Sequence, residues 1–166
     1  MERQPAWLIT KGGDVEQKII GVIGGSTAAP DILLMAEETG RLIARHGYSL
    51  ICGGMAGVME AAAKGARETK GTTIGILPHT DRHEANPYID IAIATGVGEG
   101  RNLIIVRTAD LLIAIDGEYG TLSEIAFALK MEKPVIGLNT WDIPGVIKAG
   151  SPVEAMSIAE NILAGT

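Results

Sequence analysis

The chain has 166 residues and a formal net charge of -6, and it contains no cluster of Lys or Arg. Because proteins bind nucleic acid largely by neutralising its phosphates with basic residues, this composition argues against nucleic acid as a partner. The single cysteine, Cys52, excludes an internal disulfide framework, and the three histidines lack the spacing of zinc ligands, so no metal site is predicted.

The N-terminal residues show no basic start followed by an apolar run, and no apolar stretch approaches the length that spans a membrane. We therefore expect a cytoplasmic protein without a membrane partner. The length fits one core, so residues 1–166 are expected to form a single domain.

Short apolar runs alternate with helical patterns along the chain, and glycines separate most of them. Short apolar runs bounded by turn residues are typical of strands buried in a parallel sheet. The segment 6–10 is a further candidate, as an added edge strand. Strands are predicted at residues 19–23, 48–52, 72–77, 89–94, 111–115 and 135–138.

Helical patterns follow these strands. The first helix begins at about residue 31, with Pro30 suited to its first turn and Gly47 suited to its C-terminal cap. The polar segment 79–87 has turn residues without periodicity and predicts a loop. Further helices are predicted from the glycines at 53–57 to near 71, from 96–102 to around 108, over 122–131 and over about 152–163. In the last helix the residues expected to face inward are Val153, Met156, Ala159 and Leu163.

Strands joined by helices require right-handed crossovers and a mostly parallel sheet. The scarcity of aromatic residues fits a core of aliphatic side chains between sheet and helices. The sequence therefore predicts an α/β fold: a single Rossmann-like, doubly wound domain with a mostly parallel sheet of six to seven strands and helices on both faces. Such sheets bind ligands outside the carboxyl ends of their strands.

Three glycine-rich loops fall at that edge. Glycine lets backbone N–H groups approach an anion closely, and the N-terminus of the following helix adds a partial positive charge, so these loops favour a phosphate-bearing ligand. The loop at 24–27 lacks the spacing of a dinucleotide-binding loop and has no Walker lysine, so a tight turn without a ligand is its alternative interpretation. The candidate ligand-binding residues in the three loops are Gly24, Gly25, Ser26, Gly53, Gly54, Met55, Gly117, Gly120 and Thr121.

Two charged positions have both structural and functional interpretations. Thr121 and Glu124 have the spacing of a capping box, in which case Glu124 would only stabilise a helix start. Arg101 stands at a helix N-terminus, where the helix dipole disfavours a cation, so a nearby anion would explain it, whereas a solvated surface is the simpler alternative. Cys52 is expected to be a small buried residue and not a nucleophile.

The motifs at 53–59, 100–102 and 117–124 resemble successive motifs of the LOG-like (SLOG) superfamily over nearly the whole chain. This superfamily includes cytokinin riboside 5′-monophosphate phosphoribohydrolases, molybdenum cofactor carrier proteins and the DprA/Smf-related proteins that the chain resembles most. The resemblance implies a phosphorylated small molecule as ligand, and a homodimer or higher homo-oligomer. In the hydrolase branch the motif is P-G-G-x-G-T-x-x-E with an upstream arginine, and Arg101 and Glu124 match its functional positions.

The chain departs from that motif, because Asp116 replaces the proline and Glu118 replaces the second glycine. A carboxylate 4 Å from a bound phosphate would repel it by on the order of 4 kcal/mol at an effective dielectric constant near 20. Either Glu118 turns to solvent, or the ligand lies differently, or Arg101 compensates the charge.

Two functions of different classes remain. The first is a binding or carrier protein for a nucleotide or a phosphorylated pterin such as the molybdenum cofactor, with Arg101 and Asn102 joining the loop residues as ligand contacts. The second is a phosphoribohydrolase that cleaves the N-glycosidic bond of nucleoside 5′-monophosphates, with Arg101 and Glu124 as catalytic residues. An assembly component whose loops bind nothing is a third interpretation, which the glycine-rich strand ends do not favour.

Overall fold

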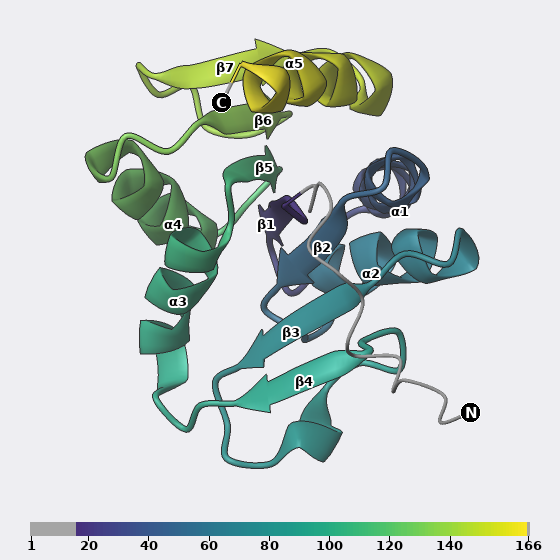
Figure 1. Cartoon of the computed structure of the whole chain (residues 1–166). Helices are drawn as coiled ribbons and strands as arrows, with labels where there is room; N and C mark the ends of the chain where they lie inside the picture. Colours follow the sequence, from purple (N-terminus) through teal and green to yellow (C-terminus); the bar gives the residue numbers. More distant parts are fainter. Residues whose placement is uncertain (1–15, 166) are drawn as a thin grey trace, which may run out of the picture.

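The computed structural model describes residues 16–165, so the candidate strand at residues 6–10 lies outside the described residues. The described chain forms a seven-stranded sheet in which every neighbouring pair of strands is parallel (Figure 1). The strand order is β4-β3-β2-β1-β5-β6-β7. The strands are β1 (Ile19–Gly24), β2 (Ser49–Cys52), β3 (Thr73–Leu77), β4 (Ile91–Ala94), β5 (Leu111–Ile115), β6 (Val135–Leu138) and β7 (Val146–Ala149).

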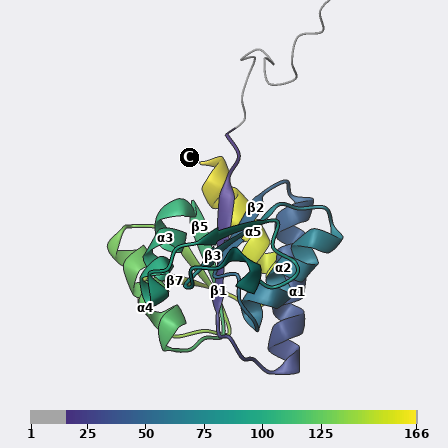
Figure 2. The ribbon, with the colours of Figure 1, turned by 90° about the horizontal axis from the view of Figure 1, so that it is seen from below.

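Helices cover both faces of this sheet (Figure 2). One buried cluster packs the helices at residues 30–45, 58–68 and 152–164 on one face, and a second packs those at 101–108 and 119–130 on the other. The predicted α/β fold, with a doubly wound parallel sheet and helices on both faces, is confirmed. The helices are α1 (Pro30–Arg45), α2 (Val58–Glu68), α3 (Arg101–Thr108), α4 (Tyr119–Lys130) and α5 (Pro152–Ala164), with short 3-10 helices at Arg82–Glu84 and Gly98–Gly100.

The order of the strands reverses between β1 and β5. From β1 the chain winds outward through β2, β3 and β4, and then it returns to β5, which pairs with the other edge of β1. Gly24 pairs with Ile115, so the two strands end side by side. In open α/β sheets the crevice at such a reversal is where ligands bind, because the loops leaving the two strands separate there.

In the C-terminal part of the chain, one strand was not predicted and one prediction is wrong. The seventh strand of the described sheet is β7, which was not predicted, because four partly exposed residues between turns give too short a pattern. Val153 does not face inward, since its side chain is 64% exposed, and Ala155 is buried instead. As predicted, Met156, Ala159 and Leu163 are buried.

Candidate functional site

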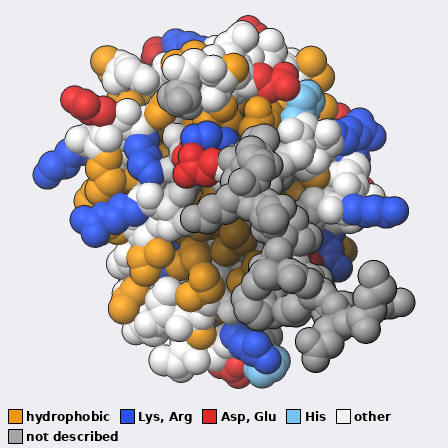
Figure 3. All heavy atoms as spheres, viewed as in Figure 1, with side chains coloured by type: hydrophobic (Ala, Val, Ile, Leu, Met, Phe, Trp, Pro, Cys, Tyr) orange, Lys and Arg blue, Asp and Glu red, His pale blue; other side chains and the backbone are white. Residues whose placement is uncertain are grey.

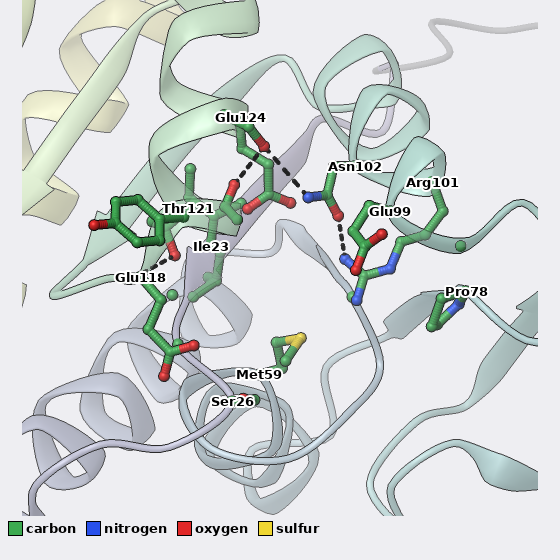
Figure 4. Close-up of a pocket in the computed structure, with 18 of the residues that line it drawn as sticks. Ile23, Ser26, Met59, Pro78, Glu99, Arg101, Asn102, Glu118, Thr121 and Glu124 are labelled. Carbon is green, nitrogen blue, oxygen red and sulfur yellow. Dashed lines mark hydrogen bonds between the residues drawn. The ribbon is translucent and has the colours of Figure 1, made fainter.

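A cavity of about 680 Å³ opens where β1 and β5 end (Figure 4). Its wall comes from β1 and the loop after it, the turn after β2, the connection after β3, and the starts of α3 and α4. Its volume lies in the range of small-molecule sites, roughly 300–1,000 Å³. The predicted site residues that line it are Gly24, Gly25, Ser26, Gly53, Arg101, Asn102, Gly120, Thr121 and Glu124.

Three residues predicted to contact a ligand do not line the cavity. Gly54 has a positive φ of 72°, and a Cβ there would lie 2.6 Å from Leu77 Cδ2. The carbonyl of Met55 accepts a hydrogen bond from the Asn86 side chain at 2.8 Å. Gly117, with a φ of 142°, would place a Cβ 2.9 Å from the Thr121 side chain. These three residues shape the loops that carry the lining residues.

The start of α3 supplies the cation of the site. Arg101 is the first residue of this helix, and its Nη1 donates a hydrogen bond to Asn102 Oδ1 at 2.5 Å. Its buried Nε has no hydrogen-bond partner within residues 16–165. Burial lowers the pKa of Arg101, and the charge of Glu124 opposes this shift. An arginine stays charged in proteins, so the cavity contains a guanidinium that makes no ion pair with the described residues.

The absence of a side chain at Gly53 makes room for this guanidinium. A Cβ at Gly53 would lie 2.6 Å from both Arg101 Nη1 and Met59 Sδ. Such a separation is far below van der Waals contact, so any larger residue would displace the arginine or the methionine. The turn after β2 therefore contributes space for the cation, which is a role that sequence spacing did not indicate.

Glu124 is the buried acid of the site. It lies on α4, its side chain lines the cavity, and the residue is only 5% exposed. No hydrogen bond or ion pair joins its carboxyl group to the rest of residues 16–165. Burial raises the pKa of Glu124 to about 8, although the nearby charge of Arg101 acts in the opposite direction. The carboxyl group is therefore mostly protonated at neutral pH and can donate a proton.

The predicted capping box of Thr121 and Glu124 is wrong. The helix begins at Tyr119, three residues before the predicted Leu122, and Glu118 is its N-cap. The box is formed by Glu118 and Thr121, each accepting a hydrogen bond from the backbone N–H of the other. Because the N-cap of a capping box is the residue before the helix, the earlier start makes Glu118 the N-cap and moves Thr121 to the N3 position, which leaves Glu124 outside the box.

The two residues that depart from the family motif have different environments. Asp116 does not line the cavity, and its backbone φ is 49°. Glu118 lines the cavity and is exposed to solvent, and its Oε1 accepts a hydrogen bond from Thr27 Oγ1 at 3.0 Å. The start of α4 is thereby connected to the loop after β1.

Some lining residues were not among the predicted site residues. Tyr119, at the first position of α4, is 84% exposed at the cavity. His79 also lines the cavity, and its Nδ1 lies 2.9 Å from Glu84 Oε2. Glu99 stands beside Arg101 (Figure 4). Tyr119 lies within the predicted motif at 117–124 and Glu99 directly precedes the motif at 100–102, so proximity along the sequence was the signal available for them.

Other predicted features concern chemistry outside this cavity. Cys52 is fully buried as predicted, and burial raises the pKa of its thiol to about 11.

Within residues 16–165, no group of three or more His, Cys, Asp or Glu side chains is placed to hold a metal ion. None of the helices in that part of the chain is long and apolar enough to cross a membrane.

Known proteins share both sequence and fold with this chain. The model of the SLOG cluster4 family matches residues 17–162. An uncharacterised protein of Archaeoglobus fulgidus is 48% identical over 120 residues, covering 72% of this chain and 79% of that protein. The cytokinin riboside 5′-monophosphate phosphoribohydrolase of Mycobacterium tuberculosis is 30% identical over 120 residues, covering 67% of this chain and 64% of the enzyme.

Solved structures extend these similarities to the fold. The molybdenum cofactor binding protein of Rippkaea orientalis has a TM-score of 0.86 and 41% identity, covering 90% of this chain and 99% of that one. The molybdenum cofactor carrier protein of Chlamydomonas reinhardtii has a TM-score of 0.84 and 39% identity, with 90% and 99% coverage. DNA processing protein A of Streptococcus pneumoniae, at 15% identity and a TM-score of 0.69 over 85% of this chain and 61% of that one, shares the fold alone.

Proposed function

Because the chain belongs to the SLOG cluster4 family, we propose that it is a binding or carrier protein for a small phosphate-bearing ligand. The ligand would be a nucleotide or a phosphorylated pterin such as the molybdenum cofactor, held in the cavity between β1 and β5. The observation that carries this proposal is the guanidinium of Arg101, which faces the cavity without an ion-pair partner in the described chain.

A partly buried cation without an ion-pair partner is costly, because burial removes part of its hydration and the hydrogen bond to Asn102 replaces only some of it. A bound phosphate would supply the missing negative charge and acceptor oxygens, and guanidinium groups hold phosphates through charge-assisted hydrogen bonds. The Asn102 side chain restrains the guanidinium through its Oδ1, so the cation is positioned before the ligand arrives. We expect Arg101 to contribute more binding free energy than any other residue of the cavity.

The similar proteins of Rippkaea and Chlamydomonas support the carrier role, since both alignments cover 99% of those chains. Their molybdenum cofactor would be cargo here. Arg101 is the group that would hold its phosphate, and the glycine-walled cavity would accept its ring system, since the volume of about 680 Å³ suits a ligand of that size.

Glu124 favours a second candidate function, a phosphoribohydrolase. Hydrolysis breaks the bond between the base and C1′ of ribose 5-phosphate, water supplies a hydroxyl group to C1′, and the base gains a proton. A buried carboxyl group with a pKa of about 8 can donate that proton and then accept one from the attacking water. The similarity to the mycobacterial phosphoribohydrolase supports this reaction, although the alignment spans only 64% of that enzyme.

One experiment tests both functions. The purified protein is mixed with a panel of nucleoside 5′-monophosphates and with a phosphorylated pterin, binding is measured by calorimetry, and free base is separated by chromatography. Binding without base release is expected for a carrier. Base release that disappears in Glu124→Gln and persists in Glu60→Gln, a carboxylate on α2 outside the cavity, would establish the hydrolase instead. The absence of binding to every phosphorylated compound would overturn the proposal.

We also propose that the chain assembles as a homodimer or larger homo-oligomer and that residues 1–166 act as one domain. On the face seen in Figure 3, hydrophobic side chains gather over β4 and beside α3, where Ile91, Ile93 and Ile104 are exposed. Exposed apolar patches of this kind are typical of interfaces. Light scattering on the wild type and on Ile91→Lys tests the assembly, and a monomeric wild type would contradict it.

A further inference from the structure

The carboxylate of Glu118 occupies the positive end of α4. As the N-cap of this 12-residue helix, it accepts a hydrogen bond from the backbone N–H of Thr121. Thr27 Oγ1 donates a second hydrogen bond to the same carboxylate at 3.0 Å. The first turn of a helix carries N–H groups that lack partners within the helix and a partial positive charge, so an acidic side chain is stabilised there.

A phosphate group of a ligand would also be attracted to the start of α4. Helix N-termini bind phosphate through their free N–H groups, and Gly120, in the first turn of α4, lines the cavity without a side chain. Glu118 Oε1 lies 3.1 Å from the point where a Cβ on Gly25 would be, so the carboxylate also fills the space next to the loop after β1. A phosphate at this end of the cavity would therefore be repelled by the negative charge of Glu118 and would have to displace its carboxylate.

Two other residues of the cavity have buried polar groups without hydrogen-bond partners among the described residues, which is expected of a site that binds a ligand. Glu124 is 95% buried, it lines the same cavity, and its carboxyl group has no hydrogen-bond partner in residues 16–165. Arg101 likewise has a buried Nε without a hydrogen-bond partner in that part of the chain. Figure 4 shows Glu118 and Arg101 on opposite sides of the cavity, so the internal anion and the unpaired cation stand at different ends.

We propose that Glu118 determines the specificity of the site by competing with the ligand's phosphate for the start of α4. While Glu118 caps the helix, a phosphate is restricted to the Arg101 end. Binding of a phosphate at α4 requires the carboxylate to swing out and to give up its hydrogen bonds from Thr27 and Thr121. This inference rests on the proposed function, because it concerns the same cavity and the same class of ligand.

The test measures the affinity of the full-length protein for inorganic phosphate and for 5′-AMP by calorimetry in three variants. Glu118→Gln keeps an oxygen that can accept the capping hydrogen bond and removes the charge. Glu118→Gly removes the side chain altogether. Glu154→Gln is the matched control, because Glu154 also lies in a first helical turn and accepts a hydrogen bond from the Gly150 N–H at 2.7 Å, but it is remote from the cavity.

We expect both Glu118 variants to bind inorganic phosphate about tenfold more tightly than the wild type, and Glu154→Gln to match the wild type. Unchanged affinity in Glu118→Gln and Glu118→Gly, or an equal gain in Glu154→Gln, would overturn the inference. Circular dichroism melting separates a lost helix cap from a changed site, and Glu118→Gln decides the result if Glu118→Gly is poorly folded.

The outcomes also separate this inference from the proposed function. If the wild type binds 5′-AMP and the Glu118 variants gain nothing, the inference fails and the proposed function stands. If only the Glu118 variants bind phosphate compounds, the inference holds and the wild-type chain is not a carrier of such ligands. If no form of the protein binds them, both are overturned.

Discussion

The two ends of the cavity hold charges of opposite sign, and these charges differ in how far hydrogen bonds from the protein satisfy them. At the start of α3, Arg101 carries a positive charge, and its buried Nε has no hydrogen-bond partner among the described residues. At the start of α4, Glu118 carries a negative charge that accepts hydrogen bonds from Thr27 and Thr121. The helix dipole disfavours the first charge and favours the second. The unsatisfied charge therefore indicates where an external ligand is needed, whereas the satisfied charge indicates where the protein already supplies its own.

The largest expected effect comes from removing the unsatisfied charge. Arg101→Met keeps an apolar stem of similar length and should weaken the binding of 5′-AMP by about 30-fold to 4,000-fold, since losing one partner of a desolvated charge pair costs roughly 2–5 kcal/mol. Arg107→Met is the matched control, because Arg107 is an exposed arginine on the same helix. Calorimetry measures both, and equal affinity in the two variants would place the anion away from Arg101.

Glu124→Gln tests the protonation state of the buried acid of the cavity, and the measured quantity is the unfolding free energy of the protein. The folded chain holds a proton on Glu124 up to a pKa of about 8, while the unfolded chain releases it near 4.5, so the unfolding free energy of the wild type falls as the pH rises between these values. Glu124→Gln has no carboxyl group at this position, so its unfolding free energy does not show this decrease with pH. We expect the stability of the variant relative to the wild type to rise by roughly 3–4 kcal/mol between pH 5 and pH 9, because each pH unit between the two pKa values contributes about 1.4 kcal/mol and the cost of burying the amide is the same at every pH.

Denaturant unfolding at several pH values measures this gain. Glu60→Gln, which removes a partly exposed carboxylate from α2, controls for the loss of charge alone. A difference between Glu124→Gln and the wild type that does not change with pH would show that Glu124 is ionised in the folded protein.

Gly53→Ala tests whether the space beside Arg101 matters for binding. The added Cβ would lie 2.6 Å from Arg101 Nη1 and would push the guanidinium away, so the affinity for 5′-AMP should fall about tenfold. Gly100→Ala is the matched control, because its Cβ would come no closer than 3.7 Å to Val97. Calorimetry compares the two, and an equal loss in both would attribute the effect to general disturbance of the loops.

The smallest expected effect is at the satisfied end of the cavity. Thr27→Val removes one hydrogen bond to Glu118, and a single hydrogen bond contributes about 0.5–1.5 kcal/mol. The carboxylate should then leave the start of α4 more easily, and the affinity for inorganic phosphate should rise about threefold. Thr108→Val removes a hydroxyl that bonds the Ile104 carbonyl at the far end of α3 and serves as control. A weaker affinity in Thr27→Val would mean that Thr27 itself contacts the phosphate.

Much of the fold could be predicted from the sequence because each strand from β1 to β6 is a short apolar run between turn residues, and such runs have few other structures available. Two elements were not predicted correctly, and each has a physical reason. The pattern of β7 is too short, since its four residues include no fully buried one and only Val146 and Ala149 pack against the core clusters. The start of α4 was misplaced because two capping patterns overlap there, Glu118 with Thr121 and Thr121 with Glu124, and the spacing of both is the same.

The sequence by itself determined the succession of strands, the glycines at their ends and the position of Arg101 at a helix start. Only the tertiary structure decided which groups meet. The pairing of Gly24 with Ile115 brings Thr27 to Glu118 across 91 residues, and the packing of Gly53 leaves space for the guanidinium of Arg101. Whether a charge has a partner depends on contacts between distant segments, because burial and hydrogen bonding are set by the folded chain as a whole and not by local spacing.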